Sequence, residues 1–125
     1  MNTTQLPFLV EGILMLTAGI FGIMLGRAGK PYGKVKLVVH LFFVLWFTAG
    51  FGFIAYGIFT MSNATKGIWI PVSVMGLAVL TQLFTGIRML ASKKTEKPLQ
   101  VTHISSAILM VLSDICAFII AGIRS

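Results

Sequence analysis

Residues 36–47 of the chain read KLVVHLFFVLWF and place one histidine, His40, inside an almost unbroken apolar run. A second stretch, PLQVTHISSAILMVL at residues 98–112, does the same with His103. The sequence contains no histidine besides these two. The apolar runs decide the fold, and the imidazoles inside them raise the question of function.

The composition excludes an ordinary soluble domain. The 125 residues are 57% hydrophobic and only 10% charged, and the mean hydropathy is +0.96. Soluble domains carry about 25% charged residues, and one small core cannot hide this much apolar surface. We therefore predict an integral membrane protein. In such a protein the net charge of +7 reports topology and does not indicate a nucleic-acid partner.

Four apolar segments follow one another along the chain, at about residues 7–26, 35–59, 68–91 and 99–123. Each has about 20 or more residues, which is enough to cross a bilayer core as a helix. Membrane barrels need alternating strands, and no such alternation is present. The sequence therefore predicts one domain over residues 1–125, an all-α integral membrane four-helix bundle.

The distribution of basic residues predicts the orientation. Two loops and their flanks hold eight of them, namely Arg27, Lys30, Lys34, Lys36, Arg88, Lys93, Lys94 and Lys97. The opposite side holds only Lys66 and Arg124. Basic loops stay on the cytoplasmic side of a membrane. We expect a multi-pass protein of a prokaryotic cytoplasmic membrane, with both basic loops inside and both termini outside.

An internal repeat relates the two halves of the chain. LTAGIFGIMLGR at residues 16–27 aligns without a gap with LTQLFTGIRMLA at residues 80–91, which places Gly22 opposite Gly86. His40 follows Gly22 by 18 residues, and His103 follows Gly86 by 17. We predict two parallel helical-hairpin repeats, about residues 7–59 and 68–123. The two histidines then lie at one depth, about 7–8 Å from the inner helix ends.

A histidine inside a membrane helix is costly unless it is paired, hydrated or liganded. The simplest interpretation is that each imidazole hydrogen-bonds a backbone carbonyl or a hydroxyl such as Thr102 or Ser106 and joins two helices. A matched pair on diagonal helices also suits haem, whose axial ligands approach iron from opposite faces. Zinc would need four ligands, and no other ligating residue lies at that depth. We predict His40 and His103 as ligands of one haem iron.

A porphyrin between helices also needs small residues at its edge and cations for its propionates. Small residues are available as Gly12, Gly19, Gly22 and Gly26 in the first segment and Gly76 and Gly86 in the third. Close helix packing explains such glycines equally well. The candidate cations at the inner rim are Arg27, Lys36 and Arg88, which the topology also explains.

Three short motifs carry a resemblance to a known family: K-x-x-x-H at residues 36–40, T-H-I-S at 102–105 and T-G-I at 85–87. With these motifs the chain resembles a minimal four-helix membrane cytochrome b, similar to the cytochrome b561 and formate dehydrogenase gamma bundles. The resemblance implies haem b, electron transfer, and a quinone or a larger redox complex as partner. It also suggests the electron-transfer subunit of a membrane oxidoreductase. Those bundles commonly carry a second histidine about 14 residues along each helix, where this chain has Ile54 and Ala117, so we expect one haem.

Two acids, Glu11 and Asp114, lie in the half of the bundle away from the histidines. Asp114 follows His103 by 11 residues, close to three helical turns, and shares its face. Carboxylates inside a membrane are proton carriers or substrate contacts by default, so both acids are proton or quinone candidates. Alternatively, Glu11 snorkels to the interface and Asp114 hydrogen-bonds a neighbouring helix. We also expect Gln82 to form an interhelical hydrogen bond.

Two further functions are consistent with the sequence. The chain could be a small proton-coupled transporter that uses Glu11 as the coupling carboxylate. It could also be a cofactor-free structural subunit of a larger membrane complex, which its small size suits. The detection of haem in the purified protein would separate the electron-transfer function from both.

Overall fold

The computed structural model describes residues 1–60 and 66–123. Residues 61–65, Arg124 and Ser125 therefore lie outside the described part, and Arg124 is one of the basic residues from which the orientation was predicted. The described chain forms four long helices and one short helical turn. They are α1 (Leu6–Ala28), α2 (Lys34–Thr60), the 3₁₀ turn η1 (Lys66–Ile68), α3 (Trp69–Ala91) and α4 (Lys97–Ile123). The predicted all-helical four-helix architecture is confirmed.

Most helices extend one or two residues beyond the predicted apolar segments. The first segment, predicted over residues 7–26, is the helix Leu6–Ala28, because backbone hydrogen bonding continues through the polar residues at the helix end. The third helix begins later than predicted because η1 precedes it. Pro7 and Pro98 stand in the first turn of α1 and α4, where a missing N–H removes no helical hydrogen bond.

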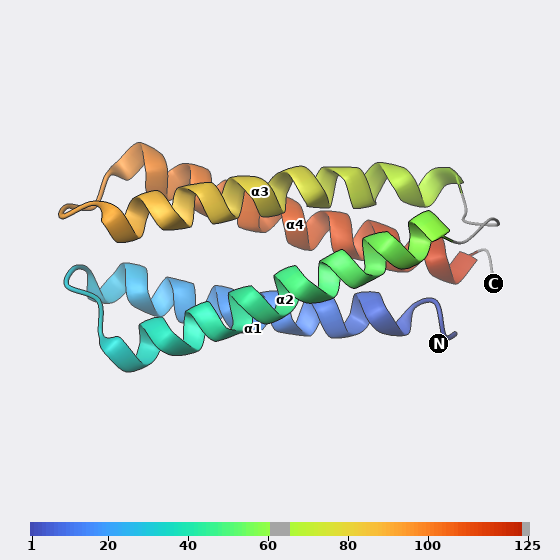
Figure 1. Cartoon of the computed structure of the whole chain (residues 1–125), viewed down its shortest axis with the longest axis horizontal. Coiled ribbons are helices and arrows are strands. Elements are labelled where there is room, and N and C mark those ends of the chain that lie inside the picture. The colour runs from blue at the N-terminus through green and yellow to red at the C-terminus, as the bar shows by residue number, and fades with distance from the viewer. Residues whose placement is uncertain (61–65, 124–125) are drawn as a thin grey trace.

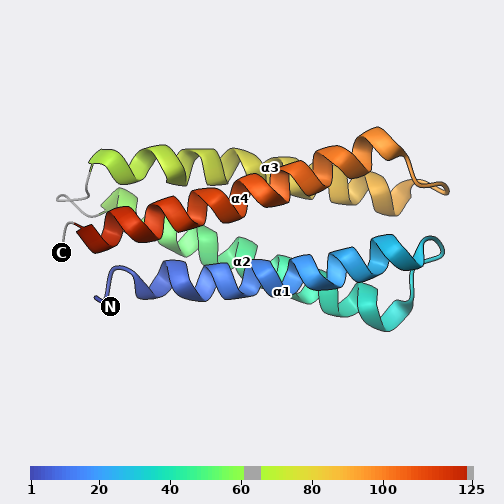
Figure 2. The same ribbon diagram turned by 180° about the vertical axis from the view of Figure 1, so that it is seen from behind.

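The four helices form two hairpins that lie side by side (Figure 1). Within the hairpins α1 packs along α2 and α3 along α4, whereas the hairpins meet mainly between α1 and α4 and only briefly between α2 and α3. The helices α2 and α4 therefore occupy diagonal positions in the bundle. Both hairpin loops lie at one end and both termini at the other, as the reverse view confirms (Figure 2).

The exterior of the bundle is apolar. Each of the four helices is long and apolar enough to cross a membrane, and 23–27 residues span about 35–40 Å. Large side chains such as Ile20, Phe53, Leu77 and Ile108 are exposed on the outer faces. A soluble monomer rarely exposes so much continuous apolar surface, and this exterior is compatible with an integral membrane protein.

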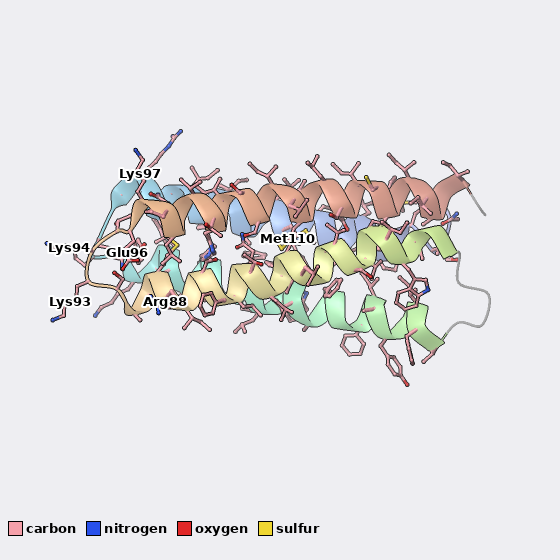
Figure 3. The ribbon with its side chains drawn as sticks, turned by 90° about the horizontal axis from the view of Figure 1, so that it is seen from above. Arg88, Lys93, Lys94, Glu96, Lys97 and Met110 are labelled. Atoms are coloured by element: carbon pink, nitrogen blue, oxygen red, sulfur yellow. The ribbon has the colours of Figure 1, made fainter. Side chains whose placement is uncertain are left out.

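The basic residues of the second hairpin gather at the loop end of the bundle. Figure 3 shows Lys93, Lys94 and Lys97 around the loop between α3 and α4, and Met110 marks the middle of the bundle. At the same end, the Lys30 ammonium donates to the backbone carbonyls of Met89 and Ser92. It thereby satisfies carbonyls at the end of α3 that have no helical partner and ties the first loop to the second hairpin.

The N-terminal segment ties the hairpins together at the opposite end. The Asn2 side-chain amide donates to the carbonyl of Ala121 at 3.1 Å, and Gln5 donates to the carbonyl of Phe118 at 3.3 Å. Both carbonyls belong to the last turns of α4, and that of Ala121 is among the last four, which have no helical partner. The bundle is therefore cross-linked by hydrogen bonds at both ends.

The turn after α1 depends on a glycine. Gly29 has φ 72° and ψ −175°, a backbone conformation that is open essentially to glycine alone. We expect Gly29→Ala to lower the free energy of unfolding in detergent by about 1–3 kcal/mol. Gly33→Ala in the same loop is the control, because a Cβ added there has no neighbour within 4 Å and its φ is not positive. Equal stability of the two variants would contradict this account.

Candidate functional site: two histidines and two buried acids

The two histidines occupy equivalent places in their helices. His40 lies six residues after the first residue of α2, and His103 lies six residues after the first residue of α4. Both rings are half-buried. Because α2 and α4 are diagonal in the bundle, the histidines stand on opposite sides of its interior.

Both imidazoles form a hydrogen bond through Nδ1. His40 Nδ1 lies 2.8 Å from the carbonyl oxygen of Ala18, which only accepts, so this nitrogen carries the proton. His103 Nδ1 lies 2.7 Å from the hydroxyl of Thr85. When that hydroxyl donates its single proton to the carbonyl of Thr81 at 2.7 Å, it accepts a hydrogen bond from His103 Nδ1.

The Nε2 atom of each neutral ring consequently carries a lone pair. Within the described residues neither Nε2 has a hydrogen-bond partner, and neither is a fully buried orphan atom. The hydroxyls of Thr102 and Ser106, which the sequence suggested as partners, bond to the backbone carbonyls of Pro98 and His103 in their own helix. Each imidazole instead bonds a group of the neighbouring helix, the Ala18 carbonyl or the Thr85 hydroxyl, so the simplest interpretation of the sequence, that the imidazoles join helices, is confirmed with other partners. The rings are anchored through Nδ1, which leaves Nε2 available.

Glycines make room for the two imidazoles. A Cβ built on Gly22 of α1 would lie 3.1 Å from Cε1 of His40, and one on Gly86 of α3 would lie 3.4 Å from Cε1 of His103. Each glycine thus faces the histidine of its own hairpin. The other glycines of α1 do not form one stripe toward a common neighbour, because Gly12 faces Asp114 and Gly19 faces open space.

Polar side chains from α3 support His103. Gln82 is buried, and its amide donates to the backbone carbonyl of His103 and, at 2.9 Å, to the hydroxyl of Ser106. This confirms the expected interhelical hydrogen bond. Thr85 was not predicted as the partner of His103. The only feature of the sequence that could have indicated this contact is the place of Thr85 in the T-G-I motif, one residue before Gly86. Ala18 could not be predicted, because its backbone carbonyl is the group that binds His40.

The candidate cations lie at the same end as the histidines but on the surface. Arg27, Lys36 and Arg88 are exposed, and they stand on α1, α2 and α3 near the loop end (Figure 1). Within the described residues no three His, Cys, Asp or Glu side chains come together as a metal site. A separate apolar groove of about 580 Å³ opens between α2 and α3, lined by residues that include Phe51, Gly76 and Leu80.

The two acids lie inside the bundle. Glu11 of α1 is 2% exposed and Asp114 of α4 is 5% exposed, so the expectation that Glu11 snorkels to the interface is wrong. Glu11 Oε2 and Asp114 Oδ1 are buried without a hydrogen-bond partner in the described structure. The expected bond from Asp114 to a neighbouring helix is therefore absent at this oxygen. Asp114 Oδ2 lies against Gly12, the residue that follows Glu11 in α1, so the two acids stand at one level of the bundle and are called the acid cluster.

The Gln82 network makes a measurable contribution to the packing of α3 on α4. We expect Gln82→Met to lower the free energy of unfolding by about 0.6–1.7 kcal/mol, as for other hydrogen bonds between membrane helices. Gln100→Met is the matched control, since Gln100 is half-buried on α4 and its side chain forms no hydrogen bond within the described residues. Denaturation in mixed micelles, followed by circular dichroism, measures both variants. An equal effect at both positions would refute a specific role for Gln82.

Comparison with known proteins adds no relative: no family model, no curated protein and no solved structure matches the chain. The resemblance to membrane cytochromes b therefore rests on the short motifs around His40, Thr85 and His103 and stays a prediction. The function has to be inferred from the two histidines and the two buried acids.

Proposed function

We propose that the chain is a membrane electron-transfer protein that holds one b-type haem between His40 and His103. The observation that supports this proposal best is the matched state of the rings, each bonded through Nδ1 and free at Nε2. Metal-ligating histidines almost always donate their other ring N–H to a carbonyl or a similar acceptor, which sets the ring orientation. The chain supplies this second hydrogen bond from Ala18 and Thr85.

The positions of the two histidines also fit those expected of the two axial ligands of a haem iron. Axial ligands approach a haem iron from opposite faces, and four-helix bundles build cofactor sites from side chains on facing helices. His40 and His103 lie on diagonal helices, each six residues after the first residue of its helix. The paired contacts of Gly22 with His40 and of Gly86 with His103 support the proposal that the halves are parallel hairpin repeats.

The surrounding residues would position the group and compensate its charge. The exposed Arg27, Lys36 and Arg88 stand at the end that propionates would occupy, and guanidinium groups bind carboxylates well. A bound haem would supply one-electron transfer. The chain itself anchors the imidazoles through Ala18 and Thr85, and Gly22 and Gly86 let the rings lie close to the backbones of α1 and α3.

The topology and the partners belong to the same proposal. The basic loop end faces the cytoplasm by the charge rule, which places the haem near the inner surface and both termini outside. One haem near one surface needs a redox partner to complete transfer across the membrane. A quinone or a larger redox complex in a prokaryotic cytoplasmic membrane fills this role, and the chain would then act as the cytochrome b subunit of an oxidoreductase.

A second candidate function is a small proton-coupled transporter. The observation that favours it is Glu11, which is 2% exposed and carries an unpartnered carboxylate oxygen. Substrate-dependent proton release that is lost in Glu11→Gln would support it. A structural subunit without a cofactor is supported by small size alone.

The haem proposal predicts a coloured protein. We expect the detergent-purified chain, expressed with haem supplied, to show a Soret band and sharp α and β bands after dithionite reduction, as a six-coordinate low-spin haem does. A haem ligated at only one side would lose this spectrum. His40→Ala and His103→Ala should therefore each lower the haem content per protein at least tenfold.

Exogenous imidazole separates ligand loss from misfolding. His40→Gly and His103→Gly should regain the six-coordinate spectrum when imidazole is added, because the free base replaces the missing side chain. Gln100→Ala, which removes a neutral polar side chain near His103 on the same helix, should retain full haem content. A colourless wild-type protein, or unchanged haem content in both alanine variants, would overturn the proposal.

The glycine contact makes a separate prediction. A side chain at Gly22 would push on the His40 ring, because even a Cβ would lie 3.1 Å from its Cε1. We expect Gly22→Leu to weaken haem retention by about 10–100-fold, the cost typical of disturbing a ligand's support. Gly19→Leu on the same helix should not weaken it, since a Cβ there meets nothing within 4 Å. Haem titration of the two apoproteins measures the difference; equal affinities would contradict the role of Gly22.

A further inference from the structure

We propose that Glu11 and Asp114 form a proton-binding site in the half of the bundle away from the histidines. At neutral pH at least one of the two carboxyl groups holds a proton and donates it in a hydrogen bond to the other. The proton leaves when the medium becomes alkaline. The proposal does not require haem, because no residue of this site contacts His40 or His103.

Burial without a partner is the first observation. Glu11 is 2% exposed and Asp114 is 5% exposed, and one oxygen of each is fully buried with no hydrogen-bond donor in the described structure. An unpaired carboxylate inside an apolar core is costly. A proton on one acid removes a charge and creates the donor that the other acid lacks.

Two glycines hold the acids together at one level of the bundle. The carboxylate of Glu11 lies against Gly50 of α2, where any Cβ would collide with Oε1. The carboxylate of Asp114 reaches from α4 to Gly12 of α1, and a Cβ there would lie 2.7 Å from Oδ2. Gly12 directly follows Glu11 in α1, so both acids stand at the same turn of that helix.

Among the side chains that the structure describes, no cation forms an ion pair or a hydrogen bond with either acid. Lys66 of η1 stands at this end of the bundle. On the helices packed around it, the other titratable side chains in this half are Tyr56 of α2 and Cys116 of α4, and both are exposed on the outer surface. The N-terminal residue Met1 is exposed at the bundle end. The arginines and lysines of α1 to α4 lie at the loop end. Two carboxylates together, without a cation, strongly disfavour double ionisation.

A proton fits the site better than a metal ion does. Calcium takes about six or more oxygen ligands, whereas this cluster offers two carboxylates among helices whose backbone carbonyls are engaged in helical hydrogen bonds. Within the described residues no third acid, cysteine or histidine joins it. Toward the termini, the polar Gln5 bonds to the carbonyl of Phe118, one helical turn beyond Asp114 on α4.

Infrared spectroscopy of the full chain in lipid vesicles tests the proposal directly. The carbonyl stretch of a protonated carboxylic acid is distinct from carboxylate bands and shifts in D₂O. The chain contains only three acidic side chains, so the assignment is simple. We expect the wild type to show such a band at neutral pH and to lose it as the pH rises. Glu11→Gln and Asp114→Asn should each change or abolish the band, and Glu96→Gln at the exposed loop should leave it unchanged.

Glycine variants test the geometry without removing an acid. Gly12→Ala, which places a Cβ against Asp114, should shift the band frequency, whereas Gly19→Ala on the same helix should not. Two results would overturn the proposal. One is the absence of a protonated-acid band at neutral pH. The other is a band that persists at every alkaline pH at which the bundle stays folded, because the acids would then be permanently neutral and structural.

Discussion

Backbone hydrogen bonding in an apolar medium is the constraint on which this architecture depends. In a membrane no water would be available along the middle of such a helix, and each N–H and C=O group would have to be paired within its own segment. The four helices satisfy this requirement internally, and their apolar side chains cover the outside. Polar side chains then have only the bundle interior and the two ends available. The interior consequently holds the chemistry of the chain.

The polar interior is divided between two levels. At the loop end, His40 and His103 are supported by Ala18 and Thr85, and Gln82 reinforces the backbone beside His103. Toward the termini, Glu11 and Asp114 are buried. Apolar residues such as Met75 and Met110 belong to the core cluster of the same bundle. A redox group at one level and a proton site at the other would keep electron and proton chemistry on opposite sides of the membrane.

Glycines accommodate each of these polar side chains. Gly22 and Gly86 stand beside the two imidazoles, and Gly12 and Gly50 stand beside the two carboxylates. The absence of a Cβ lets a polar group from one helix approach the backbone of the next. Close helix packing through small residues is common in membranes. In this bundle the space that these glycines leave is taken by ionisable side chains. The positions of the glycines therefore matter for the placement of the histidines and acids as well as for helix packing.

The sequence by itself determined the helices, because long apolar runs such as residues 35–59 have no other stable form in a membrane and their lengths match a bilayer. It also identified the residues to examine, since His40, His103, Glu11 and Asp114 interrupt those runs. Only the tertiary structure decided their partners. The Nδ1 contact of His40 is a backbone carbonyl, which no side-chain pattern can reveal, and the burial of Glu11 depends on where Gly50 of another helix lies. Periodicity along one helix reports its own faces, whereas a contact between helices depends on how each is rotated and how deep it sits against its neighbours.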